Sequence, residues 1–234
     1  MAKGEHTTQR NGGLSKSLPR RIISTLVFLI GVGIMAYAGS MLWADWQDDR
    51  RAQGEYAELR DAFERGVVDL RDINPDYIGW IYVPGTRISY PIVQGQDNDR
   101  YLHTTFRGEE RPAGAIFMDY RVTEKFEAHT TMIYGHNMRD GSMFAGLNDY
   151  LDPSFIDQNP EVVVTTYDGE ILRYRIFFAR QVYARDPVYT LDFKNPEAAR
   201  YFQNVPGGAT QFLLLSTCTD DGDSDARTMV YAAR

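Results

Sequence analysis

The single cysteine of the chain, Cys218, occupies a position that suits a reactive thiol. It follows the apolar run 211–217, which has the pattern of a strand, and it precedes the polar run 219–225. A cysteine that only fills a core lies more often in the middle of a strand, whereas chain segments at strand ends present functional groups. A nucleophile and a buried thiol are both compatible with this position.

A nucleophilic thiol needs a group that stabilises the thiolate and a donor for the oxyanion that forms on the substrate. Arg227 lies nine residues after Cys218, at the start of the next strand-like run. If the two strands pair as a hairpin, both residues lie at its open neck, where a guanidinium can stabilise either anion. The simpler alternative is an arginine that only neutralises the acidic loop between them.

Among the four histidines, His136 is the best candidate for a general acid. In the sequence Tyr-Gly-His-Asn-Met it follows the strand-like run 130–134, so it lies in a loop at a strand end. His103 and His129 have polar neighbours, and His6 lies in the basic tail. A structural role remains the more common one for any single histidine.

Other catalytic and cofactor motifs are missing from the sequence, among them G-x-S-x-G, H-E-x-x-H, Walker A and G-x-G-x-x-G. Asp221, Asp223 and Asp225 imitate the opening of a calcium loop. However, Ala226 replaces its glycine and Ala232 stands where the bidentate glutamate belongs. One cysteine also excludes a disulfide framework and a cysteine-rich zinc site. We expect neither a metal nor a cofactor.

Short strand-like runs separated by turn residues must position these groups. The eight runs are 78–83, 88–93, 115–118, 130–134, 161–166, 171–183, 211–217 and 228–232. Eight strands at this spacing predict a mainly β fold, a closed or nearly closed barrel. A short helix is expected over 196–204, before the strand that leads to Cys218.

Length and charge define the remaining organisation. The chain has 234 residues, enough for one substantial domain beside a membrane-length segment. Its net charge is −7, but five basic residues and one acidic residue give 1–21 a charge of +4, which leaves −11 for the rest. An acidic domain of this kind is not expected to bind nucleic acid.

Residues 22–43 form an uncharged apolar run that is long enough for a membrane-spanning helix. Arg20 and Arg21 precede the run, so the tail 1–21 is predicted to be cytoplasmic and the rest extracellular. A cleaved signal peptide is the alternative, because Ala36-Tyr37-Ala38 resembles a cleavage site. We favour an uncleaved anchor, because apolar residues continue to Trp43.

The segment 44–72 is charged, with Tyr56, Leu59 and Phe63 at helical spacing. It predicts one or two amphipathic helices, and Gly66 is a candidate helix end. The expected organisation is a tail (1–21), an anchor (22–43), a helical extension (44–72) and a β domain (73–234).

Taken together, these residues resemble the sortases of class B. The family motif T-L-x-T-C is matched by Leu214-Leu215-Ser216-Thr217-Cys218, except that Leu214 replaces the first threonine. His136 and Arg227 correspond to the family's histidine and arginine. The resemblance also includes the segments that begin at Asp76, Tyr90, Gly114 and Gly141, and it covers residues 73–234.

This resemblance implies an eight-stranded sortase barrel, with N-terminal helices and a helix before the cysteine strand. It implies a membrane-anchored extracellular cysteine transpeptidase that cleaves a C-terminal sorting signal of surface proteins after Thr. The acyl group passes through a thioester on Cys218 to an amine of peptidoglycan or its lipid-linked precursor. His136 and Arg227 complete the catalytic set. The residues implied at the substrate groove are Asn98, Leu102, Tyr189 and Ser216, and Asp220 is a candidate to orient His136.

Three alternatives remain beside this interpretation. A pilus-assembly sortase joins pilins through a lysine, but we find no lid-like aromatic motif after Asp45. A papain-like hydrolase is disfavoured, because its cysteine precedes its histidine in the chain. A non-enzymatic, membrane-tethered β-domain predicts that Cys218→Ala leaves all function intact.

Overall fold

The computed structural model describes residues 20–191, 202, 205–218 and 225–234. The chain divides after Trp46 into two compact units, Met1–Trp46 and Gln47–Arg234. Helix α1 (Arg20–Arg65) begins in the first unit and ends in the second. Its apolar part is long enough to cross a membrane, and its large side chains, such as Phe28, are exposed.

The C-terminal end of α1 is fixed by Gly66, as the sequence predicted. Gly66 has a φ of 61°, a left-handed conformation that costs glycine little. Its N–H donates to the carbonyl of Phe63 and the N–H of Val67 donates to the carbonyl of Ala62, the pair of bonds that defines a Schellman cap. The predicted extension is therefore the last part of α1, followed by the short helix α2 (Leu70–Ile73).

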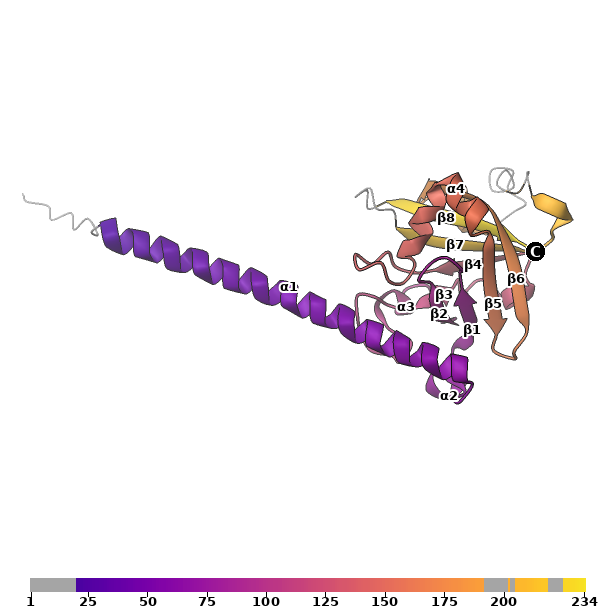
Figure 1. Ribbon diagram of the computed structural model, residues 1–234, viewed down its shortest axis with the longest axis horizontal. Helices are drawn as coiled ribbons and strands as arrows, with labels where there is room; N and C mark the ends of the chain where they lie inside the picture. The colour runs from indigo at the N-terminus through magenta and orange to yellow at the C-terminus, as the bar shows by residue number, and fades with distance from the viewer. Residues whose placement is uncertain (1–19, 192–201, 203–204, 219–224) are drawn as a thin grey trace, which may run out of the picture. The chain divides into compact units, whose positions relative to one another are not determined.

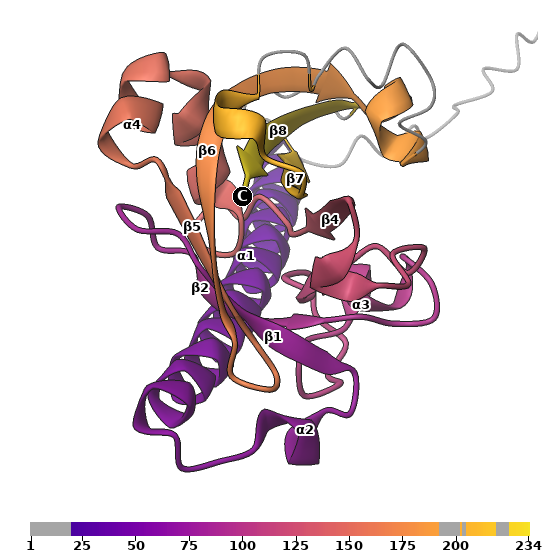
Figure 2. The ribbon, with the colours of Figure 1, turned by 90° about the vertical axis from the view of Figure 1, so that its right-hand side faces the viewer.

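Eight strands form a closed barrel in the order β1-β2-β3-β4-β7-β8-β6-β5 (Figure 1). The strands are β1 (Tyr77–Tyr82), β2 (Ser89–Val93), β3 (Ile116–Met118), β4 (Thr130–Tyr134), β5 (Glu161–Thr166), β6 (Ile171–Tyr183), β7 (Phe212–Cys218) and β8 (Ala226–Ala233). Their bounds lie within two residues of the predicted runs, which confirms the eight-stranded barrel. β6 closes it, pairing with β5 along its first part and with β8 along its second (Figure 2).

The strands that carry the candidate site are buried on both faces. Leu213 and Leu215 of β7 belong to the main core, whereas Leu214 belongs to a second apolar cluster with Met132 of β4 and Tyr231 of β8. Val188 also packs in this second cluster, on the outer side of the barrel wall. Burial of both faces explains why β7 has a continuous apolar sequence instead of an alternating one.

Short helices, which were not predicted from the sequence, connect the strands. They are α3 (Arg100–His103), α4 (Pro153–Gln158) and the 3₁₀ helices η1 (Lys125–Glu127), η2 (Ala145–Leu151), η3 (Pro187–Thr190) and η5 (Pro206–Gly208). The side chains of Asp152 and Asp186 each cap a helix that begins with proline. Helices this short have no visible hydrophobic period. The helix predicted over 196–204 lies outside the described residues, apart from Phe202.

Candidate active site

The ladder between β7 and β8 places Cys218 opposite Arg227. Seven consecutive residue pairs join the two strands in antiparallel register, from Phe212 and Ala233 to Cys218 and Arg227. Directly opposed residues of such a ladder have Cα atoms about 4.5–5.5 Å apart. The hairpin neck expected from the sequence is therefore present, and the two residues are cross-strand neighbours at its open end.

The parallel pairing of β4 with β7 brings the third candidate to the same edge. Tyr134, the last residue of β4, is paired with Ser216, and the N–H of Gly135 donates to the carbonyl of Ser216 at 3.2 Å. His136 follows immediately, so the chain leaves the sheet at the level of Cys218.

The imidazole of His136 is half-buried and is held by the main chain. Its Nε2 donates to the carbonyl oxygen of Leu102 at 2.7 Å. A carbonyl oxygen only accepts, so Nε2 carries a proton in this arrangement. Nδ1 is then the ring nitrogen that distinguishes the neutral form from the imidazolium. Leu102, which the resemblance implies at the substrate groove, thus lies against the candidate general acid.

Arg227 is half-buried at the start of β8. Its Nη1 donates to the carbonyl oxygen of Ala226 at 2.8 Å, which holds the guanidinium against its own strand. A guanidinium has five N–H donors and keeps its charge at every physiological pH. The residue can therefore bind an anion that forms at the level of Cys218. The structure does not describe Asp220.

The other three residues implied at the groove belong to one polar network. The hydroxyls of Tyr189 and Ser216 are 2.8 Å apart. Asn98 donates to the carboxylate of Asp119 at 3.0 Å, and Arg121 joins this carboxylate to the carbonyl oxygen of Tyr189. The network connects the loop after β2 with the outer face of β7. Asn98 also accepts the N–H of Tyr120, so its amide is oriented from both ends.

Asp119 is the centre of this network, and its role was not predicted from the sequence. Its side chain is fully buried; burial alone would raise its pKa, but hydrogen bonds from Arg121, Tyr134 and Asn98 outweigh that effect and hold the pKa below its ordinary value. Burial and the charge of Asp119 raise the pKa of Tyr134, which stays a neutral donor. The available sequence signal was an acidic residue directly after an apolar strand, with Arg121 two residues later.

The structure is a closed eight-stranded barrel with a cysteine at the end of β7, and comparisons with known proteins give its family. Residues 81–234 match the model of the sortase domain family. Sortase B of Listeria monocytogenes is 37% identical over 191 residues, which covers 76% of this chain and 75% of the relative. The chain therefore belongs to the sortase family.

Solved structures agree on the class. The Staphylococcus aureus sortase B–substrate complex superposes with a TM-score of 0.69 at 29% identity, over 80% of this chain and 97% of that chain. A Streptococcus pyogenes class B sortase involved in pilus biogenesis gives 0.64 at 30% identity, over 72% and 98%. With the family match, these similarities identify a class B cysteine transpeptidase.

Proposed function

We propose that this protein is a membrane-anchored extracellular transpeptidase that cleaves a C-terminal sorting signal after Thr and attaches surface proteins to the cell wall. One observation carries the proposal. The registers of β4, β7 and β8 bring His136, Cys218 and Arg227 to one edge of the barrel from distant places in the chain. These are the residues that such a reaction needs as acid, nucleophile and oxyanion donor.

In the proposed reaction, the Cys218 thiolate attacks the Thr carbonyl carbon, and Arg227 with backbone N–H groups binds the oxyanion. The C–N bond then breaks, and His136 gives a proton to the leaving amine. The acyl group remains on sulfur as a thioester. An amine of peptidoglycan or its lipid-linked precursor attacks this thioester, passes a proton to His136 and releases the thiolate. Water in place of the amine gives hydrolysis.

The proposed membrane topology rests on the segment of the chain that precedes the barrel. The apolar part of α1 is long enough to span a bilayer, and Arg20 and Arg21 stand at its start. Basic residues remain on the cytoplasmic side, so the barrel lies outside the cell. The peptide substrate would bind on the outer face of β7, between Leu102 and the Tyr189–Ser216 pair.

The test uses the full-length chain in detergent, incubated with a library of sorting-signal peptides and amine acceptors. Mass spectrometry should find an acyl adduct on Cys218 and an amide between the Thr carboxyl and the acceptor. Cys218→Ala should give neither product. Absence of any adduct, while Cys218 still reacts with an alkylating reagent, contradicts the proposal. Full function of Cys218→Ala would instead support a binding domain.

Pilus assembly is a second candidate, favoured by the similarity to the S. pyogenes class B sortase involved in pilus biogenesis. The two candidates differ in the acceptor amine. With the same acyl peptide, wall anchoring predicts faster capture by peptidoglycan fragments, and pilus assembly predicts faster capture by a lysine side chain of a folded pilin. A competition between the two acceptors decides between them.

A further inference from the structure

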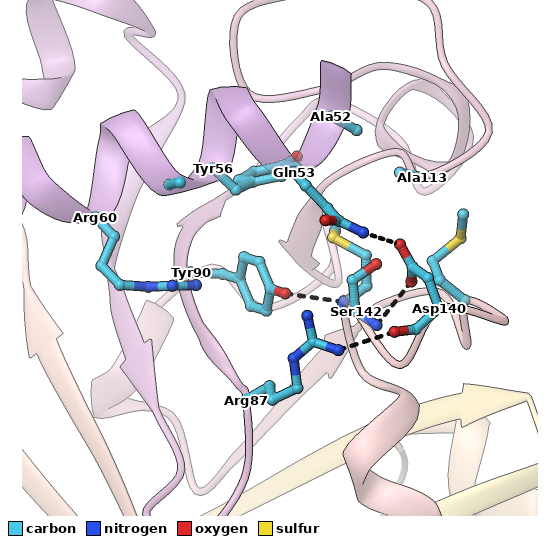
Figure 3. A pocket seen from close by; sticks show the side chains of 12 residues that line it. Ala52, Gln53, Tyr56, Arg60, Arg87, Tyr90, Ala113, Asp140 and Ser142 are labelled. Atoms are coloured by element: carbon cyan, nitrogen blue, oxygen red, sulfur yellow. Dashed lines mark hydrogen bonds between the residues drawn. The ribbon is translucent and has the colours of Figure 1, made fainter. Parts of the chain in front are cut away.

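A cavity of about 250 Å³ lies between α1 and the loop that carries His136 (Figure 3). We call residues 135–144 the histidine loop. The other walls of the cavity come from the turn after β1 and from β2. The polar side chains around the cavity are Gln53, Tyr56 and Arg60 of α1, Arg87 of the turn, Tyr90 of β2, and Asp140 and Ser142 of the histidine loop.

The histidine loop folds back on itself, with His136 at its base and Asp140 near its tip. The N–H of Phe144 donates to the carbonyl oxygen of His136 at 2.8 Å, and Asn137 pairs with Met143 as an antiparallel bridge. Asp140 also accepts the N–H of Ser142 on its own carboxylate at 2.9 Å. These bonds join the two arms of the loop next to His136, so we expect a displacement of Asp140 to move His136.

Three groups from outside the loop hold its far side, as the dashed lines of Figure 3 show in part. Gln53 of α1 donates through Nε2 to the carboxylate of Asp140. Arg87 donates to the carbonyl oxygen of Asp140 at 2.8 Å, and the N–H of Met143 donates to the hydroxyl of Tyr90 at 3.0 Å. The helix, the turn and the strand thus meet on one short segment.

The carboxylate of Asp140 is suited to this role because it is charged and only half-buried. Burial alone would raise its pKa, but hydrogen bonds from Ser142 and Gln53 and the charge of Arg87 hold the pKa below its ordinary value. A charged acceptor strengthens each of these hydrogen bonds relative to a neutral one.

We infer that Gln53 and Asp140 are positioning residues for His136: α1 holds the tip of the histidine loop and thereby fixes the imidazole at its base. The inference rests on the proposed function, because it assumes that His136 transfers the proton. The hydrogen bond from His136 to Leu102 fixes one side of the ring, and the clamp on Asp140 fixes the loop that presents it.

The decisive variant is Gln53→Glu in the full-length chain. It places a second carboxylate next to that of Asp140. The repulsion should displace the loop tip and lower kcat about 10- to 100-fold, since a misplacement near 1 Å is enough for such a loss. KM for the peptide should change less than about twofold, because neither residue lies at the Tyr189–Ser216 pair.

Rescue separates positioning from a loss of folding. In Gln53→Glu with Asp140→Asn, the new amide donates to the new carboxylate and still accepts the N–H of Ser142 through its oxygen. This reversal of donor and acceptor should restore kcat to within about threefold of wild type. Glu58→Gln is the matched control. It exchanges the same two residue types on the same helix, but Glu58 contacts Arg107, at 3.6 Å, and not the histidine loop. It should leave kcat unchanged.

The ¹⁵N signals of the His136 ring give a readout that a purely structural role would not move. They should change in Gln53→Glu and return in the double variant, while thermal unfolding shows both proteins folded. If Gln53→Glu does not fold, Gln53→Ala removes the contact without repulsion and should lower kcat about threefold to tenfold.

The outcomes distinguish the two proposals. An active His136→Ala variant would overturn the proposed function itself. An inactive His136→Ala, combined with wild-type kcat and wild-type ring signals in Gln53→Glu or in Gln53→Ala, would overturn only the positioning role. Failure of the double variant to recover, when it folds normally, would also overturn it.

Discussion

Two parts of the proposed site are positioned by different means. Cys218 and Arg227 are the last pair of a regular ladder, so the backbone hydrogen bonds of β7 and β8 fix their relative place. His136 lies beyond the end of β4, and side-chain contacts hold its loop. A ladder shares its strain over many bonds, whereas a loop depends on a few.

This difference indicates which part of the site keeps its geometry when neighbouring residues are substituted. Substitutions around β7 and β8 should change chemistry only when they remove a reacting group, since the register persists. Substitutions around the histidine loop should change the rate without touching the reacting groups. Single replacements in the two regions test this contrast.

The largest effect is expected at Arg227, within the ladder. Arg227→Lys keeps the charge but loses the planar set of donors, so kcat should fall about 10²- to 10³-fold, the usual cost of an oxyanion donor. The thermal midpoint should stay within about 2 °C, because the side chain is half-buried and the ladder remains. Wild-type kcat in Arg227→Lys would show that the charge alone suffices.

A smaller effect is expected from Gly135→Ala, at the junction of β4 and the histidine loop. A Cβ at this position would lie 2.4 Å from Ile116 Cδ1 and 2.7 Å from Phe144 Cγ, both buried side chains. Such overpacking costs about 1–3 kcal/mol of stability. We expect kcat to fall about tenfold, measured with the same peptide and acceptor. An unchanged kcat in a destabilised protein would show that the loop absorbs the strain.

Asp119→Asn tests the polar network around Asp119, with an expected activity loss of about threefold because Asn98 and Tyr189 lose one anchor. Its main effect is on stability and depends on pH. The folded-state pKa of Asp119 is lowered, so its contribution is present above the unfolded value near 3.9 and is lost as pH falls through the folded value.

Urea unfolding at two pH values measures this contribution. At pH 7 the free energy of unfolding of Asp119→Asn should be lower than that of wild type by about 1–3 kcal/mol. The difference should shrink as the pH falls below the unfolded value near 3.9 and through the lower folded-state pKa, because the unfolded chain binds the proton first and the folded carboxyl only at lower pH. A difference that is independent of pH would contradict the role of the charge.

The smallest effect on activity is expected from Leu214→Thr, which restores the family motif. Leu214 is fully buried in the outer apolar cluster with Met132 and Tyr231. The change removes apolar contacts there and should cost about 1–3 kcal/mol in thermal or urea unfolding. We expect kcat to remain within about twofold of wild type. A large gain or loss of kcat would show that this position acts on the chemistry.

The contrast between the two regions also separates what the sequence could predict. The neighbourhood of Cys218 and Arg227 follows from a local hairpin, because two apolar runs on either side of an acidic loop define both strands. The position of His136 beside Cys218 depends on the parallel pairing of Tyr134 with Ser216, which are 82 residues apart in the chain. Only the resemblance to a family predicted that His136 belongs with Cys218.

Contacts that depend on single polar side chains were not predictable. Gln53 and Asp140 are 87 residues apart, and each lies in a segment that contains several other polar or charged side chains. Asp119 shows its importance only when Asn98 and Tyr134 are placed around it. Periodicity reports which face of an element is apolar, but it does not report which polar groups from different elements meet.

The partner of the His136 ring has a consequence for how such an enzyme can change over evolutionary time. The acceptor at position 102 is a peptide oxygen, which every amino acid supplies. If the Leu102 side chain contacts the substrate as proposed, it is free to vary with the recognised peptide while the proton on Nε2 stays in place. Substrate preference and the protonation of His136 Nε2 can therefore change independently, although both depend on residue 102.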